Sequence, residues 1–199
     1  MVFGPILMNF AGTLRDLAGR LDAQGCRWAV IGALAAAIHG VPRTTVDIDV
    51  LIDAAFAQRL DVLLADLGYR VSFRWEESSH FAPTRPDRCP LDFLHAHRPH
   101  SLAMLERAQR VELGEDGLRV PVVQVEDLIG LKVQALVNDP DRRRGELVDI
   151  RALLEAAAAR AGRLDCTRID CGRVREYFSL FGEERTLDEL IRGLEDALA

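Results

Sequence analysis

Three carboxylates lie in the apolar stretch RTTVDIDVLID, residues 43–53, which is otherwise typical of a buried β-strand. Side chains alternate between the two faces of an extended chain, so Asp47, Asp49 and Asp53 share one face. Two like charges about 4 Å apart at an effective dielectric of about 20 repel by roughly 4 kcal/mol. The stretch alone leaves two interpretations open: the carboxylates are solvated, or they hold a cation.

The other face of this stretch is apolar and is expected to pack into the core, because it consists of Val46, Ile48, Val50 and Ile52. The face with the carboxylates also carries Arg43, Thr45 and Leu51. A strand with one apolar face and one charged face can place its carboxylates beside a ligand while the sheet holds them in position.

The pattern of apolar residues predicts alternating helices and strands around this stretch, and then a helical region. We expect a fold of the α/β (α+β) class, with a core at residues 1–124 and a helical region at 125–199 packed on it. The predicted helices of the core cover residues 10–25, 33–39, 56–67 and 101–108, and its other predicted strands cover 27–32, 69–75, 80–84, 91–97 and a hairpin at 110–123.

A tight turn at Gly32 separates the strand predicted at 27–32 from the short helix that precedes the carboxylates. Glycine lets a ligand approach the backbone closely, and the first N–H groups of a helix suit a phosphate. A triphosphate bound there would need a divalent cation on its flank. Asp47 and Asp49 lie two residues apart on one face and could hold that cation.

The composition narrows the classes of function. With 199 residues, 49% of them hydrophobic, the chain can bury a substantial core. A net charge of −6 argues against binding nucleic acid with the whole surface, although a local basic patch at 142–144 stays open. Lys132 is the only lysine among 25 basic residues. The ammonium group of lysine is a compact point charge, which the guanidinium group of arginine cannot replace at every site. Lys132 is therefore a candidate functional residue.

We expect a cytoplasmic protein with no membrane partner. The longest apolar run, residues 28–38, is too short to span a bilayer. No basic residue precedes Arg15, which argues against a signal peptide. The four cysteines have no zinc-ligand spacing and are expected to be reduced thiols; they are Cys26, Cys89, Cys166 and Cys171.

Two segments together resemble a known family. VIGALAAAIHGVPRTTVDIDVLI, residues 30–52, is similar to the glycine turn, short helix and Asp-x-Asp strand of the DNA polymerase beta superfamily of nucleotidyltransferases. Its Arg-x-Thr-x-Asp-x-Asp spacing is most similar to the AbiEii-like nucleotidyltransferases, which are type IV toxins. VEDLIGLKVQALVNDPDRRRGELVDIRALL, residues 125–154, resembles their later helical segment.

The resemblance implies a mixed sheet flanked by helices and a magnesium-dependent transfer of a nucleoside monophosphate from an NTP to a hydroxyl. It also implies a third carboxylate on a later strand, which we assign to Asp92 in CPLDFL. Asp47, Asp49 and Asp92 would then hold two Mg²⁺ ions, with Mn²⁺ as an alternative, and Asp92 would help to activate the acceptor hydroxyl. An Asp92 exposed at the start of an edge strand is the alternative.

The resemblance also assigns the nucleotide-binding residues, namely Gly32, Ala33, Arg43, Thr45, Lys132 and Asp149. For Lys132 the alternative is a lysine whose stem packs at a helix edge. For Arg43 the alternative is an ion pair with Asp47 or Asp49. Asp149 either faces the nucleotide, pairs with Lys132 or is solvated on a helix face.

The implied acceptor is an RNA such as tRNA, and the implied role is that of a toxin with a cognate antitoxin protein. Two alternatives stay open: transfer to a small molecule or a protein, and an inactive module that binds a nucleotide or a partner. The sequence departs from the family pattern at two places, because Ala33 replaces a frequent Ser and Gly145-Glu146 replaces an expected Lys-Asp. Neither departure removes a carboxylate, so we predict an active enzyme.

Overall fold

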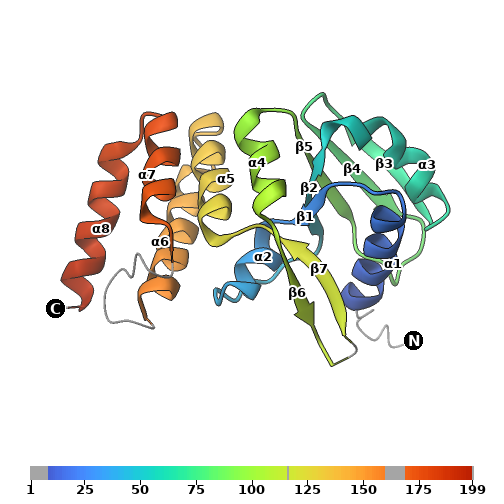
Figure 1. Cartoon of the computed structure of the whole chain (residues 1–199), viewed down its shortest axis with the longest axis horizontal. Coiled ribbons are helices and arrows are strands. Elements are labelled where there is room, and N and C mark those ends of the chain that lie inside the picture. Colours follow the sequence, from blue (N-terminus) through green and yellow to red (C-terminus); the bar gives the residue numbers. More distant parts are fainter. Residues whose placement is uncertain (1–8, 116, 160–168, 199) are drawn as a thin grey trace, which may run out of the picture. The chain divides into compact units, whose positions relative to one another are not determined.

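The computed structural model describes residues 9–115, 117–159 and 169–198, which form two compact units (Figure 1). The first unit comprises Met1–Ala35 and Arg43–Val123 and holds a β-sheet. The second comprises Ala36–Pro42 and Gln124–Ala199 and is helical. The second unit thus includes the segment 36–42, which the predicted division at residue 124 did not anticipate.

The sheet of the first unit is mixed and has seven strands in the order β3-β4-β5-β2-β1-β7-β6. Strand β2 lies near its centre, parallel to β5 and antiparallel to β1. This arrangement confirms the predicted mixed sheet. The strands are β1 (Trp28–Val30), β2 (Ile48–Asp53), β3 (Tyr69–Arg74), β4 (Ser78–Pro83), β5 (Leu91–Ala96), β6 (Gln109–Leu113) and β7 (Leu118–Val122).

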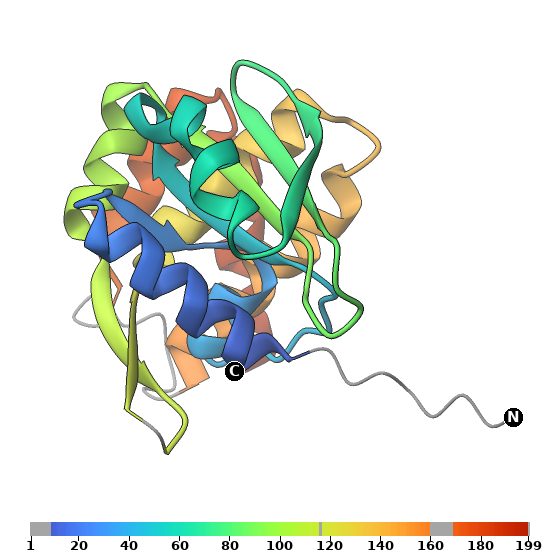
Figure 2. The same ribbon diagram turned by 90° about the vertical axis from the view of Figure 1, so that its right-hand side faces the viewer.

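Helices α1 (Phe10–Ala23) and α3 (Leu60–Ala65) lie next to each other over one face of this sheet (Figures 1 and 2). The helix predicted at 56–67 is only partly helical in the α form, because a 3₁₀ helix, η1 (Ala54–Arg59), precedes α3. Helix α4 (Pro99–Arg107) packs against strand β2. The short helix α2 (Gly32–Ile38) follows β1.

Strand β2 is buried on both faces over part of its length. Ile48, Val50 and Ile52 are completely buried, as their spacing predicts. The predicted core position of Val46 is wrong, because the strand begins only at Ile48 and Val46 is 58% exposed. Leu51 is completely buried although it shares the face with the carboxylates, on the strand against which α4 packs.

The second unit packs helices α6 and α7 against α5. A Cβ atom at Gly130 in α5 would lie 2.7 Å from the ring of Tyr177 in α7, so glycine allows this close approach. The Tyr177 hydroxyl donates a hydrogen bond of 2.7 Å to the buried carboxylate of Asp127. The helices are α5 (Val125–Asn138), α6 (Arg143–Ala159), α7 (Cys171–Leu180) and α8 (Glu184–Leu198).

The cysteines follow the expectation only in part. Cys26 and Cys89 are buried free thiols, and burial raises the pKa of the Cys26 thiol to about 12. Cys171 is disulfide-bonded, which contradicts the expectation of four reduced thiols, and Cys166 lies outside the described residues. In the part of the chain that the structure describes, no helix is both long and apolar enough to cross a membrane.

Candidate active site

Asp49 and Asp92 lie side by side on adjacent parallel strands. The register of β2 and β5 pairs the two residues directly, and residues paired in this way point to the same face of the sheet. Strand β5 lies between β4 and β2, so the alternative of an Asp92 exposed at an edge strand is wrong. The structure thus brings together two of the three carboxylates that the sequence nominates for catalysis.

The Asp49 carboxylate lies against the backbone of Gly32, where strand β1 gives way to helix α2. Gly32 has a φ of +64°, and a Cβ atom there would lie only 1.9 Å from Asp49 Oδ2. The backbone N–H of Ile31 donates to the backbone carbonyl of Asp49 at 3.0 Å, which joins the turn to the strand. Only glycine satisfies both the backbone angle and the close approach.

Asp47 lies just before β2 begins, in a bend, and a neighbouring threonine orients its carboxylate. The Thr45 hydroxyl donates to Asp47 Oδ1 at 2.5 Å. Both residues are half-buried, whereas Arg43 is exposed. Asp47, Thr45 and Arg43 therefore lie close in the chain to Asp49 but outside the regular strand.

Asp92 has a second polar neighbour that the sequence did not indicate. Strand β4 pairs with β5 so that His80 lies opposite Asp92, and His80 Nδ1 lies 2.7 Å from Asp92 Oδ1. Both side chains are partly open to solvent, at 39% for His80 and 29% for Asp92. The contact requires strands β4 and β5 to be adjacent in a fixed register, which no local pattern reveals.

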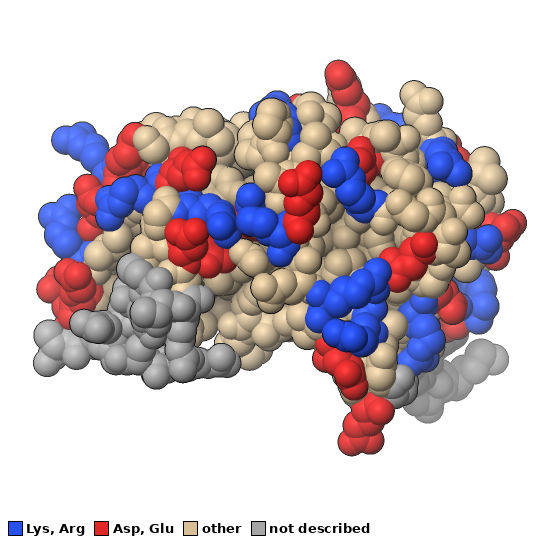
Figure 3. Space-filling view, in the orientation of Figure 1, with Lys and Arg blue, Asp and Glu red and all other residues tan. Residues whose placement is uncertain are grey.

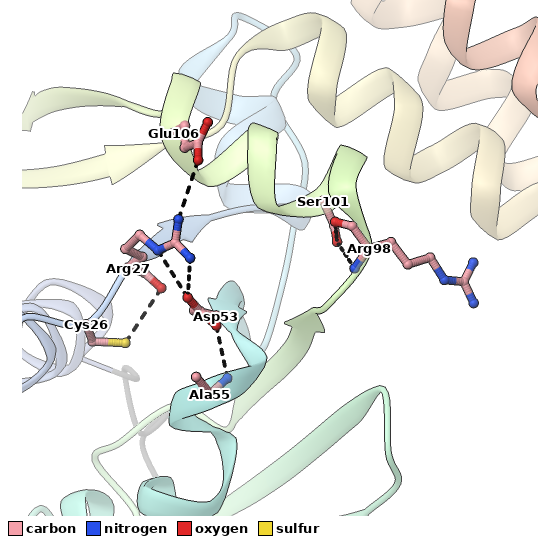
Figure 4. Close-up of polar contacts among 7 residues, drawn as sticks. All are labelled: Cys26, Arg27, Asp53, Ala55, Arg98, Ser101 and Glu106. Atoms are coloured by element: carbon pink, nitrogen blue, oxygen red, sulfur yellow. Dashed lines mark hydrogen bonds and ion pairs between the residues drawn. The ribbon is translucent and has the colours of Figure 1, made fainter.

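Asp53, the last carboxylate of the quoted stretch, is engaged in structural contacts (Figure 4). Arg27 donates to Asp53 Oδ2 from two nitrogens, at 3.0 and 2.5 Å. The other oxygen accepts the backbone N–H of Ala55 at 2.9 Å, at the start of η1. Arg27 also lies 3.5 Å from Glu106 of helix α4. Asp53 thus anchors the end of β2 and provides a useful comparison with Asp49.

The donor set fits the predicted magnesium, because carboxylate oxygens are the ligands that Mg²⁺ prefers. Within residues 9–115, 117–159 and 169–198, however, no group of three or more His, Cys, Asp or Glu side chains is arranged to hold a metal ion. One oxygen of Asp92 is held by His80 and one oxygen of Asp47 by Thr45. The magnesium site at Asp47, Asp49 and Asp92 therefore stays a prediction.

Lys132 and Asp149 pair with each other in the second unit. Lys132 Nζ lies 2.5 Å from Asp149 Oδ2 and 3.0 Å from Glu146 Oε2, linking helix α5 to α6. Asp149 is only 7% exposed, so the alternative of a solvated carboxylate is wrong. The structure also shows that Glu146, which departs from the family pattern, provides a second buried partner for the lysine.

The chain matches a known protein family over most of its length. A family model described as "Nucleotidyl transferase AbiEii toxin, Type IV TA system" matches residues 15–197. No curated protein matches the chain.

Several solved structures share the fold at low sequence identity. The antibiotic-resistance factor ANT(2'')-Ia in solution has a TM-score of 0.58 and 15% identity, over 89% of this chain and 94% of that one. An antigenic nucleotidyltransferase-like protein from Paracoccidioides brasiliensis has a TM-score of 0.53 and 16% identity, over 94% of each chain. The lincosamide antibiotic adenylyltransferase LnuA has a TM-score of 0.50 and 15% identity, over 74% of this chain and 96% of that one. By the match over residues 15–197, this chain belongs to the AbiEii family of nucleotidyltransferases.

Proposed function

We propose that this nucleotidyltransferase transfers a nucleoside monophosphate from an NTP to a hydroxyl of an RNA acceptor such as tRNA. The observation that carries the proposal is the alignment of Asp49 with Asp92 on one face, with the Asp49 carboxylate against the turn at Gly32. A carboxylate pair beside a glycine turn suits a substrate with a triphosphate at one end and a reacting phosphorus above the carboxylates.

In the proposed reaction the triphosphate lies along the backbone of Gly32 and Ala33, and Arg43 and Thr45 contact its oxygens. The acceptor oxygen attacks the α-phosphorus, the bond to the bridging oxygen breaks and pyrophosphate leaves. Asp92 takes the proton of the acceptor hydroxyl, and His80 holds the carboxylate in place at 2.7 Å.

Asp47, Asp49 and Asp92 are proposed to bind Mg²⁺, or Mn²⁺, which would offset the charge of the triphosphate and of the leaving pyrophosphate. The support for this is the chemistry of the donors and the pairing of two of them in the sheet. Asp47 would join them from its position two residues before Asp49.

Lys132 stays a proposed nucleotide-binding residue, and Asp149 and Glu146 orient its ammonium group. The side chain of Lys132 is 13% exposed, and those of its two partners are 7% and 10% exposed. A buried ammonium with two carboxylates is held in one orientation, which is what a phosphate contact requires.

A second candidate acceptor is the hydroxyl of a small molecule. It is favoured by the fold shared with an enzyme solved with adenylyl-2''-tobramycin, at a TM-score of 0.55 and 16% identity. The lincomycin-bound LnuA structure points the same way. We favour RNA because the family to which this chain belongs is described as a toxin of type IV systems.

The proposed cellular role follows from the same description. We propose a cytoplasmic toxin whose action on RNA is held in check by a cognate antitoxin protein. The family description supports the role of a toxin. The RNA acceptor and the antitoxin protein are parts of our proposal.

The test is a transfer assay with each NTP labelled at the α-phosphate and with tRNA, other RNA and small-molecule acceptors, in Mg²⁺ and in chelator. We expect labelled RNA from the wild type, none in chelator, and at least about a hundredfold less from Asp49→Asn. The matched control is Asp53→Asn, which changes a carboxylate on the same face of the same strand but keeps an oxygen for the Ala55 N–H. Equal activity of Asp49→Asn and wild type would contradict the proposal.

A further inference from the structure

Strand β3 is the edge strand of the sheet beyond β4, and it ends in exposed aromatic side chains. Phe73 is 46% exposed, and Trp75, just after the strand, is 67% exposed. Their rings lie edge to face with centroids 5.7 Å apart. Large apolar side chains gathered on a surface commonly mark a binding site. These two rings are not part of the hydrophobic core. Phe81 and Phe93 are, because both are buried and their rings contact each other.

A row of paired residues joins these aromatic rings to the candidate catalytic carboxylates. Across four adjacent strands, Phe73 pairs with His80, His80 with Asp92, and Asp92 with Asp49. Directly paired residues point to the same face, so the row runs along one face of the sheet. The ring of His80 lies 5.6 Å from that of Phe73, centroid to centroid, and its Nδ1 contacts Asp92 at 2.7 Å.

The order of these residues puts the aromatic rings on the side of the site from which the acceptor enters. Their placement rests on the proposed function, in which the triphosphate lies at Gly32, on the β1 side of Asp49. An in-line displacement puts the entering oxygen opposite the leaving pyrophosphate. Since the pyrophosphate leaves toward Gly32, the acceptor must enter from the other side of Asp49, where Asp92, His80 and Phe73 follow in turn.

The side chains on this side of Asp49 indicate which part of the acceptor binds there. Phe73 lies two strand spacings, roughly 10 Å, from Asp92, which leaves room for a nucleoside between the hydroxyl and the rings. Exposed aromatic faces stack on unpaired bases with little preference for sequence. We propose that Phe73, Trp75 and His80 form a stacking subsite for an unpaired base of the RNA acceptor. His80 is a positioning residue that joins this subsite to Asp92.

The first test uses tryptophan fluorescence, because the chain has two tryptophans and Trp28 is buried at 3% exposure. Three kinds of ligand are titrated separately into wild type: short single-stranded RNA, the same RNA with an abasic 3′ end, and each NTP. No NTP is present in the RNA titrations. We expect quenching by the intact RNA and far weaker quenching by the abasic RNA. Quenching must be lost in Trp75→Phe, in which only Trp28 emits. Equal quenching by NTP alone, or by abasic RNA, would overturn the proposal.

The second test compares RNA affinity among variants at the exposed rings. Trp75→Leu keeps an apolar side chain without a ring, and Trp75→Phe keeps a ring. We expect the first to weaken RNA binding by roughly 5- to 150-fold, the equivalent of about 1–3 kcal/mol per stacked base, and the second to retain most of the affinity. Val62→Ala, at a 76% exposed apolar position in α3, is the control and should bind as wild type does.

The two proposals fail in different ways. RNA binding that is unchanged in Trp75→Leu would overturn the stacking subsite even if wild type transfers nucleotide to RNA. Transfer of label only to a small molecule would overturn both the RNA acceptor and the subsite. Ring-dependent binding of RNA by a wild type that transfers no nucleotide would support the subsite and contradict the proposed reaction.

Discussion

Gly32 combines two constraints that are rarely found at one residue. Its backbone is in the left-handed region, and the Asp49 carboxylate occupies the space where a side chain would begin. The backbone angle alone would strain any other residue, whereas the contact with Asp49 would also displace a proposed metal ligand. These two effects can be separated, because Gly25 shares the backbone angle but has no neighbouring atom at that position.

We therefore predict that Gly32→Ala reduces nucleotide transfer strongly, by at least about tenfold, whereas Gly25→Ala leaves it near the wild-type value. Backbone strain should cost each variant about 1 kcal/mol or somewhat more of stability, and Gly32→Ala should lose more than Gly25→Ala because its Cβ also meets Asp49. Activity assays and urea unfolding on the two variants check this. Similar activities in the two variants would show that the contact between Gly32 and Asp49 has no role in the reaction.

At the scale of residues, the sequence predicts the carboxylates better than their neighbours. Asp49 and Asp92 could be nominated because each lies in a short apolar strand of a known pattern. His80 and Glu146 could not, because their contacts depend on which strands and helices become adjacent. Alternation also assigned Leu51 to the carboxylate face correctly, but it gave no sign that this part of the face is buried.

At the scale of elements, a single lysine joins helices α5 and α6. Lys132 contacts Glu146 and Asp149, and all three side chains are largely buried. Removal of one partner from a buried ion pair is costly because it leaves charge in a poorly solvated place. A nearby exposed pair offers a comparison, since Arg151 contacts Glu155 within α6 at 2.7 Å with both side chains about half exposed.

We predict that Lys132→Met lowers the free energy of unfolding by about 3–5 kcal/mol. The same change at the exposed arginine, Arg151→Met, should cost less than about 1 kcal/mol. Urea unfolding of both variants at neutral pH makes the comparison. If Lys132→Met is as stable as Arg151→Met, the cluster does not hold the two helices together.

Two glycine-to-alanine substitutions in the helical unit should change stability in opposite directions. Gly130→Ala places a Cβ atom 2.7 Å from the Tyr177 ring, so overpacking should lower stability by about 1–3 kcal/mol. Gly193→Ala, inside α8 with no atom within 4 Å of its new Cβ, should raise stability by about 0.5–1 kcal/mol. Thermal melts of both variants test this, and a stabilised Gly130→Ala would contradict the packing.

The elements themselves were largely predictable, since apolar periodicity located the strands and helices described above. The failures have local causes. The predicted helix at 56–67 begins with a 3₁₀ segment, because Asp53 accepts the Ala55 N–H and ends the strand in a tight turn. The predicted strand at 43–53 begins later, at Ile48, because Val46 and Asp47 form a bend instead.

At the scale of the whole molecule, charges of both signs are mixed. Basic and acidic side chains are interspersed over the face shown in Figure 3. Two arginines of the segment 142–144 follow this pattern, because Arg142 contacts Glu146 and Arg143 makes two contacts with Glu183. The Arg143 guanidinium holds the pKa of the Glu183 carboxyl below its usual value. Arg142 and Arg143 are therefore engaged in ion pairs within the protein.

Stability should fall in mild acid because of a buried histidine. Burial lowers the pKa of His95, whose ring lies 3.0 Å from the Ser79 hydroxyl and 2.8 Å from the Glu76 carbonyl. The unfolded chain therefore binds a proton more readily than the folded one as the pH falls below about 6.5. This contribution to stability is complete above that pH and is lost progressively below it.

We predict that the difference in unfolding free energy between about pH 7.5 and about pH 5.5 shrinks in His95→Asn. Urea unfolding at the two pH values makes the measurement. An unchanged pH dependence in His95→Asn would assign the loss of stability to other groups, such as His100, whose pKa burial also lowers.

The central claim is that the face with Asp49 and Asp92 binds an NTP. Calorimetric titration of each of the four NTPs, with Mg²⁺ and with chelator, tests it without an acceptor. We predict binding by wild type and by Asp53→Asn that needs Mg²⁺, and loss of that binding in the double variant Asp47→Ala, Asp49→Ala. Absence of NTP binding by folded wild type, or equal binding by the double variant, would contradict the account.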